Sequence, residues 1–117
     1  MAYVDGFVLT VPTRKLAAYR KIATLAGKVW KSHGALEYRE CAGDDLQTQY
    51  GVPFAKLAKA KRGETVLFSW IVYKSKADRK RVMKKVMADK RMNMNPKDMP
   101  FDMKRMSYGG FKVLVDM

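Results

Sequence analysis

The chain has 117 residues, a common size for a single domain, and its 24 lysines and arginines against 11 aspartates and glutamates give a formal net charge of +13. Charged residues are 30% of the total, and no apolar run approaches the roughly twenty residues of a spanning helix, which excludes a membrane-embedded class. Cys41 is the only cysteine, and no basic segment followed by an apolar one stands at the N-terminus. We therefore expect no internal disulfide, no signal peptide and a cytoplasmic location.

The first part of the chain predicts a strand, a long helix and a second strand. Residues 3–11 are rich in β-branched and aromatic side chains, which is typical of a strand, and Thr13 is the expected N-cap of the helix that follows. Residues 35–41 alternate as a half-buried strand, with Tyr38 and Glu40 on one face. Between them, from 14 to about 32, apolar residues recur within one arc of roughly 140°: Leu16, Tyr19, Ile22, Ala23, Ala26, Val29 and Trp30.

The rest of the chain predicts two further strands around a second long helix. Residues 42–53 read as a polar loop and residues 54–61 as a short helix. Residues 65–73 are apolar almost throughout, which predicts a strand inside the sheet that is covered on both faces. A helix is expected from Ser75 to about Asp89, an irregular segment over 90–106, and a last strand over 108–115.

This order of elements predicts one α+β domain over residues 1–117. Two β-α-β units in tandem give a ferredoxin-like βαββαβ sandwich, in which two helices cover one face of a four-stranded antiparallel sheet. The other face of the sheet holds apolar side chains and would lie open in a single chain. We expect a second copy to cover it, so that the protein is a homodimer.

Several segments resemble one bacterial family. Residues 3–8 (YVDGFV), 68–71 (FSWI), 99–102 (MPFD), 104–106 (KRM) and 108–111 (YGGF) are similar to the YbaA-like family of uncharacterised bacterial proteins, and the likeness extends over essentially the whole chain. The resemblance implies a ferredoxin-like fold of the dimeric α+β-barrel group, in which two sheets pack face to face. That family has no assigned activity, so the resemblance implies no functional residues. The wider group includes small monooxygenases with a pocket beside the sheet, a likeness of fold alone.

Asp5, His33 and Arg105 are the candidates for catalysis. Asp5 lies in an apolar strand beside the predicted last strand, which would bring Arg105 or Lys112 near it. It is either a pocket carboxylate or, as we favour, part of a structural ion pair. His33 ends the first long helix and could act as a general base. A capping or solvent-facing role is favoured, because no partner can be placed beside it.

Four aromatic residues, Trp70, Tyr73, Tyr108 and Phe111, are candidate walls for a small apolar ligand, with the core or a dimer interface as the alternative. Cys41, next to Arg39, is expected to be a packed and inert thiol. Soft metal binding is one interpretation of the loop methionines, and the filling of gaps beneath the loop is the one we favour. These methionines are Met92, Met94, Met99, Met103 and Met106. We expect no metal and no cofactor.

A basic run on the second long helix is the candidate nucleic-acid site. Lys80, Arg81, Lys84 and Lys85 can point outward together and follow phosphates. The segment lacks aromatic residues that would stack on bases, so a solvated helix face is the favoured interpretation, with weak non-specific attraction of nucleic acid.

Three functions stay open at this point, and the sequence does not decide whether the protein is an enzyme. The preferred one is a homodimer that binds or converts a small organic molecule in a pocket beside the sheet. The alternatives are a nucleic-acid-associated protein that uses the helix around 75–89, and a structural or stress-associated interaction protein without catalysis.

Overall fold

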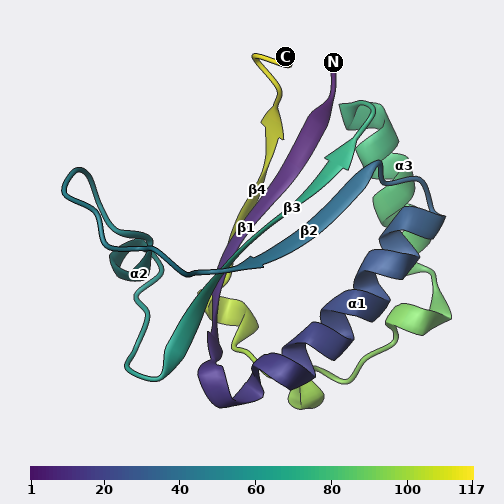
Figure 1. Ribbon diagram of the computed structural model, residues 1–117. Coiled ribbons are helices and arrows are strands. Elements are labelled where there is room, and N and C mark those ends of the chain that lie inside the picture. Colours follow the sequence, from purple (N-terminus) through teal and green to yellow (C-terminus); the bar gives the residue numbers. More distant parts are fainter.

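The computed structural model describes all 117 residues, as a four-stranded antiparallel sheet with two long helices on one face (Figure 1). The strands are β1 (Tyr3–Pro12), β2 (Glu37–Ala42), β3 (Glu64–Tyr73) and β4 (Ser107–Lys112), and the helices are α1 (Leu16–Ser32), α2 (Phe54–Leu57) and α3 (Lys76–Met87). The strand order β2-β3-β1-β4 confirms the predicted ferredoxin-like fold. None of the helices has the length and apolar composition that a membrane crossing requires.

Side chains alternate between the two faces of the sheet, and the register decides which of them meet the helices. β1 and β3 pair with Leu9 opposite Leu67 and Asp5 opposite Ile71, so that the odd-numbered residues of both strands face the helix layer. The buried residues that the helices place on this face are Tyr19, Ala23, Ala26, Val29 and Trp30 of α1 and Val82 and Val86 of α3. The main core therefore lies between the sheet and the two long helices.

The ends of several elements differ from expectation. Thr13 does not cap α1, because its hydroxyl pairs with that of Thr65 at 2.8 Å and a 3₁₀ turn (Thr13–Lys15) leads into the helix. Ser75 does cap α3 and accepts a hydrogen bond from the backbone of Asp78. α2 spans only four residues, and beyond it Lys59 adopts a left-handed backbone conformation (φ 53°) that stops the helix. β4 ends at Lys112, so residues 113–115 do not extend it.

β3 lies inside the sheet, as expected, but in the single chain helices cover only one of its faces and the cover on its other face is incomplete. On the other face, here called the open face, Phe68 of β3 is 44% exposed and Phe111 of β4 is 61% exposed. The Phe68 ring lies 5.9 Å from the ring of Phe54 and 5.6 Å from that of Trp70, measured between centroids. Phe54 belongs to an arm (residues 43–63) that projects away from the sheet and carries α2 (Figure 1). The single chain thus leaves an apolar sheet face uncovered.

Candidate functional site

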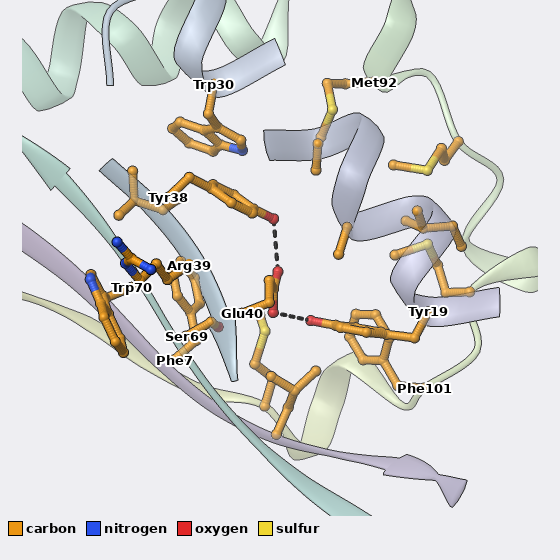
Figure 2. A pocket seen from close by; sticks show the side chains of 18 residues that line it. Phe7, Tyr19, Trp30, Tyr38, Arg39, Glu40, Ser69, Trp70, Met92 and Phe101 are labelled. Carbon is orange, nitrogen blue, oxygen red and sulfur yellow. Dashed lines mark hydrogen bonds between the residues drawn. The ribbon is translucent and has the colours of Figure 1, made fainter. Parts of the chain in front are cut away.

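An apolar cavity of about 180 Å³ lies between the sheet and α1 (Figure 2). Fifteen of its eighteen lining residues are hydrophobic, including Phe7 of β1, Trp30 of α1 and Ile71 of β3. Phe101, from the irregular segment between α3 and β4, packs edge-on against Tyr19 with 5.6 Å between ring centroids. The cavity is therefore walled by the sheet, by α1 and by that segment.

The cavity exists because several of its lining side chains are short, and methionines line one side of it. Ala23 and Ala26 of α1 and Ser69 of β3 line the cavity where longer residues would fill it. The segment over 90–106 supplies Met92, Met94, Met99 and Met106 to the lining. Only Met103 of the five loop methionines stays outside, half exposed. Because thioether side chains are flexible and polarizable, this wall can adapt to the shape of a ligand.

Glu40 of β2 is the polar centre of the cavity. Its Oε1 accepts a hydrogen bond of 2.7 Å from the hydroxyl of Tyr19, and its Oε2 accepts one of 2.7 Å from the hydroxyl of Tyr38 (Figure 2). Strand alternation places Tyr38 and Glu40 on the same face of β2, and the packing of α1 brings Tyr19 to them. Each carboxylate oxygen keeps a further lone-pair direction for a donor on a ligand.

The two tyrosines act as hydrogen-bond donors at every ordinary pH. Burial raises the pKa of Tyr19 far above its ordinary value of 10, and the negative charge and hydrogen bonding of Glu40 add to the shift. The pKa of Tyr38 is raised in the same way, by burial first and by Glu40 second. Both phenols therefore stay protonated, and they hold the Glu40 carboxylate in a fixed orientation.

The same three residues separate the cavity from a wider groove of about 570 Å³ between α1 and the edge strand β2. Tyr19, Tyr38 and Glu40 line both spaces. Gly27 of α1 lets the Tyr38 ring pack against the helix, because a Cβ there would lie 2.9 Å from Cδ1 of Tyr38. Glycine inside a helix costs about 0.5–1 kcal/mol relative to alanine, so the fold accepts a cost to seat this ring. The groove is thus the route by which Glu40 faces solvent.

Comparison with known proteins places the chain in a family. Residues 2–103 match the family described as a protein of unknown function, DUF1428. The chain belongs to this family. It is 45% identical over 116 residues to the uncharacterized protein YbaA of Escherichia coli strain K12, covering 99% of both chains, and equally similar to YbaA of Shigella flexneri. The likeness to the YbaA-like family seen in the sequence is confirmed.

Two solved structures share the fold of this DUF1428 chain. An uncharacterized NIPSNAP domain protein from Burkholderia xenovorans superposes with a TM-score of 0.55 at 12% identity, over 95% of this chain and 93% of that one. A dimeric ferredoxin-like protein from an uncultured marine organism superposes with a TM-score of 0.56 at 13% identity, over 100% of both chains. At such identities the likeness concerns the fold alone.

Asp5 lies outside the cavity, in a buried ion pair with Arg79 of α3. Its Oδ1 accepts from Nε of Arg79 at 2.8 Å, and its Oδ2 accepts from the hydroxyl of Tyr73, also at 2.8 Å. The expected partners were Arg105 or Lys112, and that expectation was wrong. Arg79 reaches Asp5 because α3 crosses the same face of the sheet, where its guanidinium also lies 5.5 Å from the ring centre of Tyr3.

His33 forms a hydrogen bond with a carboxylate and Arg105 forms an ion pair, both away from the cavity. Nε2 of His33 lies 2.7 Å from Oδ2 of Asp89, a carboxylate that Arg91 also binds. These contacts tie the C-terminal end of α1 to the residues after α3. Arg105 donates two hydrogen bonds to Glu64, of 2.7 and 2.9 Å, and so joins the segment before β4 to the start of β3.

These ion pairs predict a loss of stability in acid. Hydrogen bonds from Arg105 lower the pKa of Glu64 from 4.5 to about 2, and those from Arg91 and His33 hold the pKa of Asp89 well below 3.8. A carboxylate whose pKa is lower in the folded state stabilises the fold fully above its unfolded pKa and loses that contribution as pH falls toward the folded value. Urea melts should therefore show the unfolding free energy falling between about pH 4.5 and pH 2.

Glu64→Gln provides the control for this prediction. The variant should start from a lower stability at pH 7 and lose less of it below pH 4.5, because one of the linked groups is gone. An equally steep decline in the variant would show that Glu64 does not contribute to the acid sensitivity.

The four aromatic candidates lie in different places. Trp70 lines the cavity but projects from the open-face side of the sheet, where its Nε1 donates to Glu37 at 3.2 Å. Tyr73 is fully buried in the core against Trp30, and Phe111 lies on the open face. Tyr108 stacks on Phe7 with ring centroids 5.9 Å apart and is largely exposed. The structure therefore brings only Trp70 of this set to the cavity.

The basic residues of α3 lie on its solvent side. Lys80, Arg81, Lys84 and Lys85 are all exposed, and Arg81 is engaged by the carboxylate of Asp78 one turn earlier. Their arrangement is that of a solvated helix face, and the nucleic-acid alternative stays a prediction. Cys41 is half-buried on the open face opposite Phe68.

Sequence reasoning missed the residues that give the cavity its polarity, Glu40 and Tyr19. The signal was present: Glu40 shares a strand face with Tyr38, and Tyr19 belongs to the apolar arc of the helix. A carboxylate on the helix-facing side of a half-buried strand should have been singled out. No cluster of three His, Cys, Asp or Glu side chains that could hold a metal ion occurs in the chain.

Proposed function

We propose that the protein is a homodimer that binds a small organic molecule in the cavity between the sheet and α1, with Glu40 as the group that orients it. The observation that carries this proposal is a single carboxylate, held by two tyrosines, at the edge of an otherwise apolar cavity. Ligand sites commonly combine apolar walls with a few fixed polar groups in this way. Glu40 is also the cavity group best able to accept a proton if the ligand is converted.

The free energy that an unfilled cavity costs the fold supports the view that a ligand occupies it. An enclosed dry void of about 180 Å³ would cost about 4 kcal/mol, at about 24 cal/mol per Å³, relative to a filled core, and because this cavity opens toward the groove that figure is an upper bound. That is a large share of the stability of an ordinary domain. A longer side chain at Ala23 or Ala26 would remove much of that cost, and the alanines at both positions leave a space that a ligand can fill.

The open face supports the dimer. Phe68, Phe111 and their neighbours form an apolar surface that the chain itself leaves uncovered, and such surfaces are typical of partner sites. A second copy packing sheet against sheet covers both surfaces at once by two-fold symmetry. One of the fold neighbours is described as a dimeric ferredoxin-like protein, which is consistent with this use of the face.

Ala26→Leu should abolish ligand binding and leave the fold intact. The leucine side chain occupies the cavity, and we expect it to raise the free energy of unfolding of the ligand-free protein by about 1 kcal/mol, because filling a void adds packing contacts. A thermal-shift screen of small organic molecules checks this. Molecules that raise the Tm of the wild type by several degrees should not raise that of the variant.

Ala18→Leu is the matched control, since Ala18 lies on the exposed side of the same helix. This variant should respond to every molecule as the wild type does. Molecules that raise the Tm of Ala26→Leu as strongly as that of the wild type bind elsewhere and count against the cavity.

A further inference from the structure

We infer that the ligand of this cavity is a small organic cation, an ammonium group on an apolar body about the size of one ring. This inference rests on the proposed function and names the class of molecule that the site selects. It rests on a comparison of the acidic residues. Glu40, in the cavity, has no cationic partner, whereas every other partly buried acid in the chain has one.

Glu40 is the only acidic residue that is neither exposed nor paired with a cation. The other acids that are not fully exposed all bind an arginine or a histidine: Asp5, Glu37, Glu64, Asp78 and Asp89. The remaining acids are exposed: Asp44, Asp45, Asp98, Asp102 and Asp116. In a chain with 24 lysines and arginines, one carboxylate facing an apolar cavity is left without a counter-charge.

The hydrogen bonds to Glu40 satisfy its two acceptor oxygens but bring no opposite charge to the carboxylate. Tyr19 and Tyr38 each donate one hydrogen bond, but both are neutral phenols, so neither supplies a positive charge to the carboxylate. Burying a charge is costly unless an opposite charge accompanies it. Arg20 on the groove side and Arg39 on the same strand make no salt bridge to Glu40, which leaves the place of the counter-charge to a ligand.

The walls of the cavity suit an ammonium group as well. Trp30, Tyr38 and Phe101 present aromatic rings around the space next to Glu40 (Figure 2). The negative faces of aromatic rings attract cations within about 6 Å, most strongly where water is excluded. The methionine sulfurs of the lining are polarizable and add to this preference. The one cation of the lining, Arg39, is already paired with Glu37 on the opposite face of β2, so an anion would meet no unpaired cation there.

The volume sets the size of the apolar body. A cavity of about 150 Å³ holds one benzene ring in a well-studied core mutant, and the cavity here measures about 180 Å³. Benzylamine therefore matches the space, with its ring among the aromatic and methionine side chains and its ammonium group at Glu40.

Because the protein has a high net positive charge, a preference for cationic ligands would point to a local binding site. At a net charge of +13 the protein repels cations and attracts anions at long range, so non-specific binding favours anions over cations. Selective cation binding must then come from a local group. It should persist when salt screens the outer charges, because a partly buried pair is screened less than exposed charges are.

The experiment is a calorimetric titration of the full-length protein with benzylamine, benzyl alcohol and benzoate at pH 7, which share a ring and differ in charge. We expect benzylamine to bind at least about tenfold more tightly than benzyl alcohol, and benzoate not to bind in the cavity. Glu40→Gln should reduce benzylamine binding by about tenfold to a hundredfold and leave benzyl alcohol little changed. Asp44→Asn, the same loss of a carboxylate at an exposed position on the arm, should change neither.

Tyr38→Phe keeps the carboxylate and frees one of its lone pairs, so benzylamine binding should persist in this variant even if Glu40→Gln folds poorly. Equal binding of benzylamine and benzyl alcohol, or benzylamine binding that Glu40→Gln leaves unchanged, would overturn the preference for a cation while the proposed ligand site stands. Binding of none of the three probes would overturn both.

Discussion

Asp5→Ala should lower the free energy of unfolding by about 3 kcal/mol or more, the largest effect that we expect from any single substitution in the core. Asp5 is 2% exposed and receives hydrogen bonds from Arg79 and Tyr73 at once. Its removal leaves the guanidinium and the phenol in the interior without an acceptor. For a domain of this size the Tm should fall by about 10 °C or more, as measured by circular dichroism or calorimetry.

A double-mutant cycle shows how much of the stability lost in Asp5→Ala comes from the unpaired charge of Arg79. Tyr73→Phe removes one hydrogen bond to the carboxylate but keeps the ion pair, and should cost about 1.5–3 kcal/mol. Asp5→Ala combined with Arg79→Met should cost less than the sum of the two single variants by about 1–3 kcal/mol, because no charge is left unpaired. Strictly additive effects would mean that the Asp5–Arg79 pair contributes nothing as a pair.

Phe68→Glu should convert the proposed dimer into a monomer. Phe68 stands on a central strand of the open face, beside Phe54 and Trp70, where a sheet-to-sheet interface would bury it. A buried phenylalanine contributes about 1.5–3 kcal/mol, and a two-fold interface counts it twice. We therefore expect the dissociation constant to rise by at least about a hundredfold, which sedimentation velocity at micromolar concentration detects.

Leu25→Glu is the control for charge and for loss of a large apolar side chain, because Leu25 lies on the outer side of α1. This variant should sediment as the wild type does. A monomeric wild type, or a Phe68→Glu variant that stays dimeric, would contradict the proposed interface.

The fold was predictable from the sequence because its signals are local. The helical periodicity of residues 16–30 and the apolar strand over 65–73 specify the elements, and short right-handed connections leave few ways to join them. The ends of elements were less predictable, since they depend on single contacts such as the one between the hydroxyls of Thr13 and Thr65. The order of elements predicted an open sheet face, but the composition of the strand over 65–73 did not show that helices cover only one of its faces.

The site was less predictable because it depends on contacts between distant segments. Tyr19 and Glu40 meet only when α1 packs back over β2, and helical and strand periodicity give the face of each residue but not the offset between elements. The same reason explains the wrong partner for Asp5. Arg105 and Lys112 were expected because the last strand lies beside the first, and only the position of α3 across the sheet makes Arg79 the partner.

The central claim is that a ligand occupies the space between the sheet and α1, and methionine methyl NMR tests it most directly. Four of the nine methionines line the cavity, whereas Met1, Met87 and Met117 are exposed outside it. With ¹³C-methyl methionine in the protein, added benzylamine should shift the signals of Met92, Met94, Met99 and Met106 and leave those of the three exposed residues in place. Shifts confined to the exposed methionines, or no shift at saturating ligand, would contradict the account.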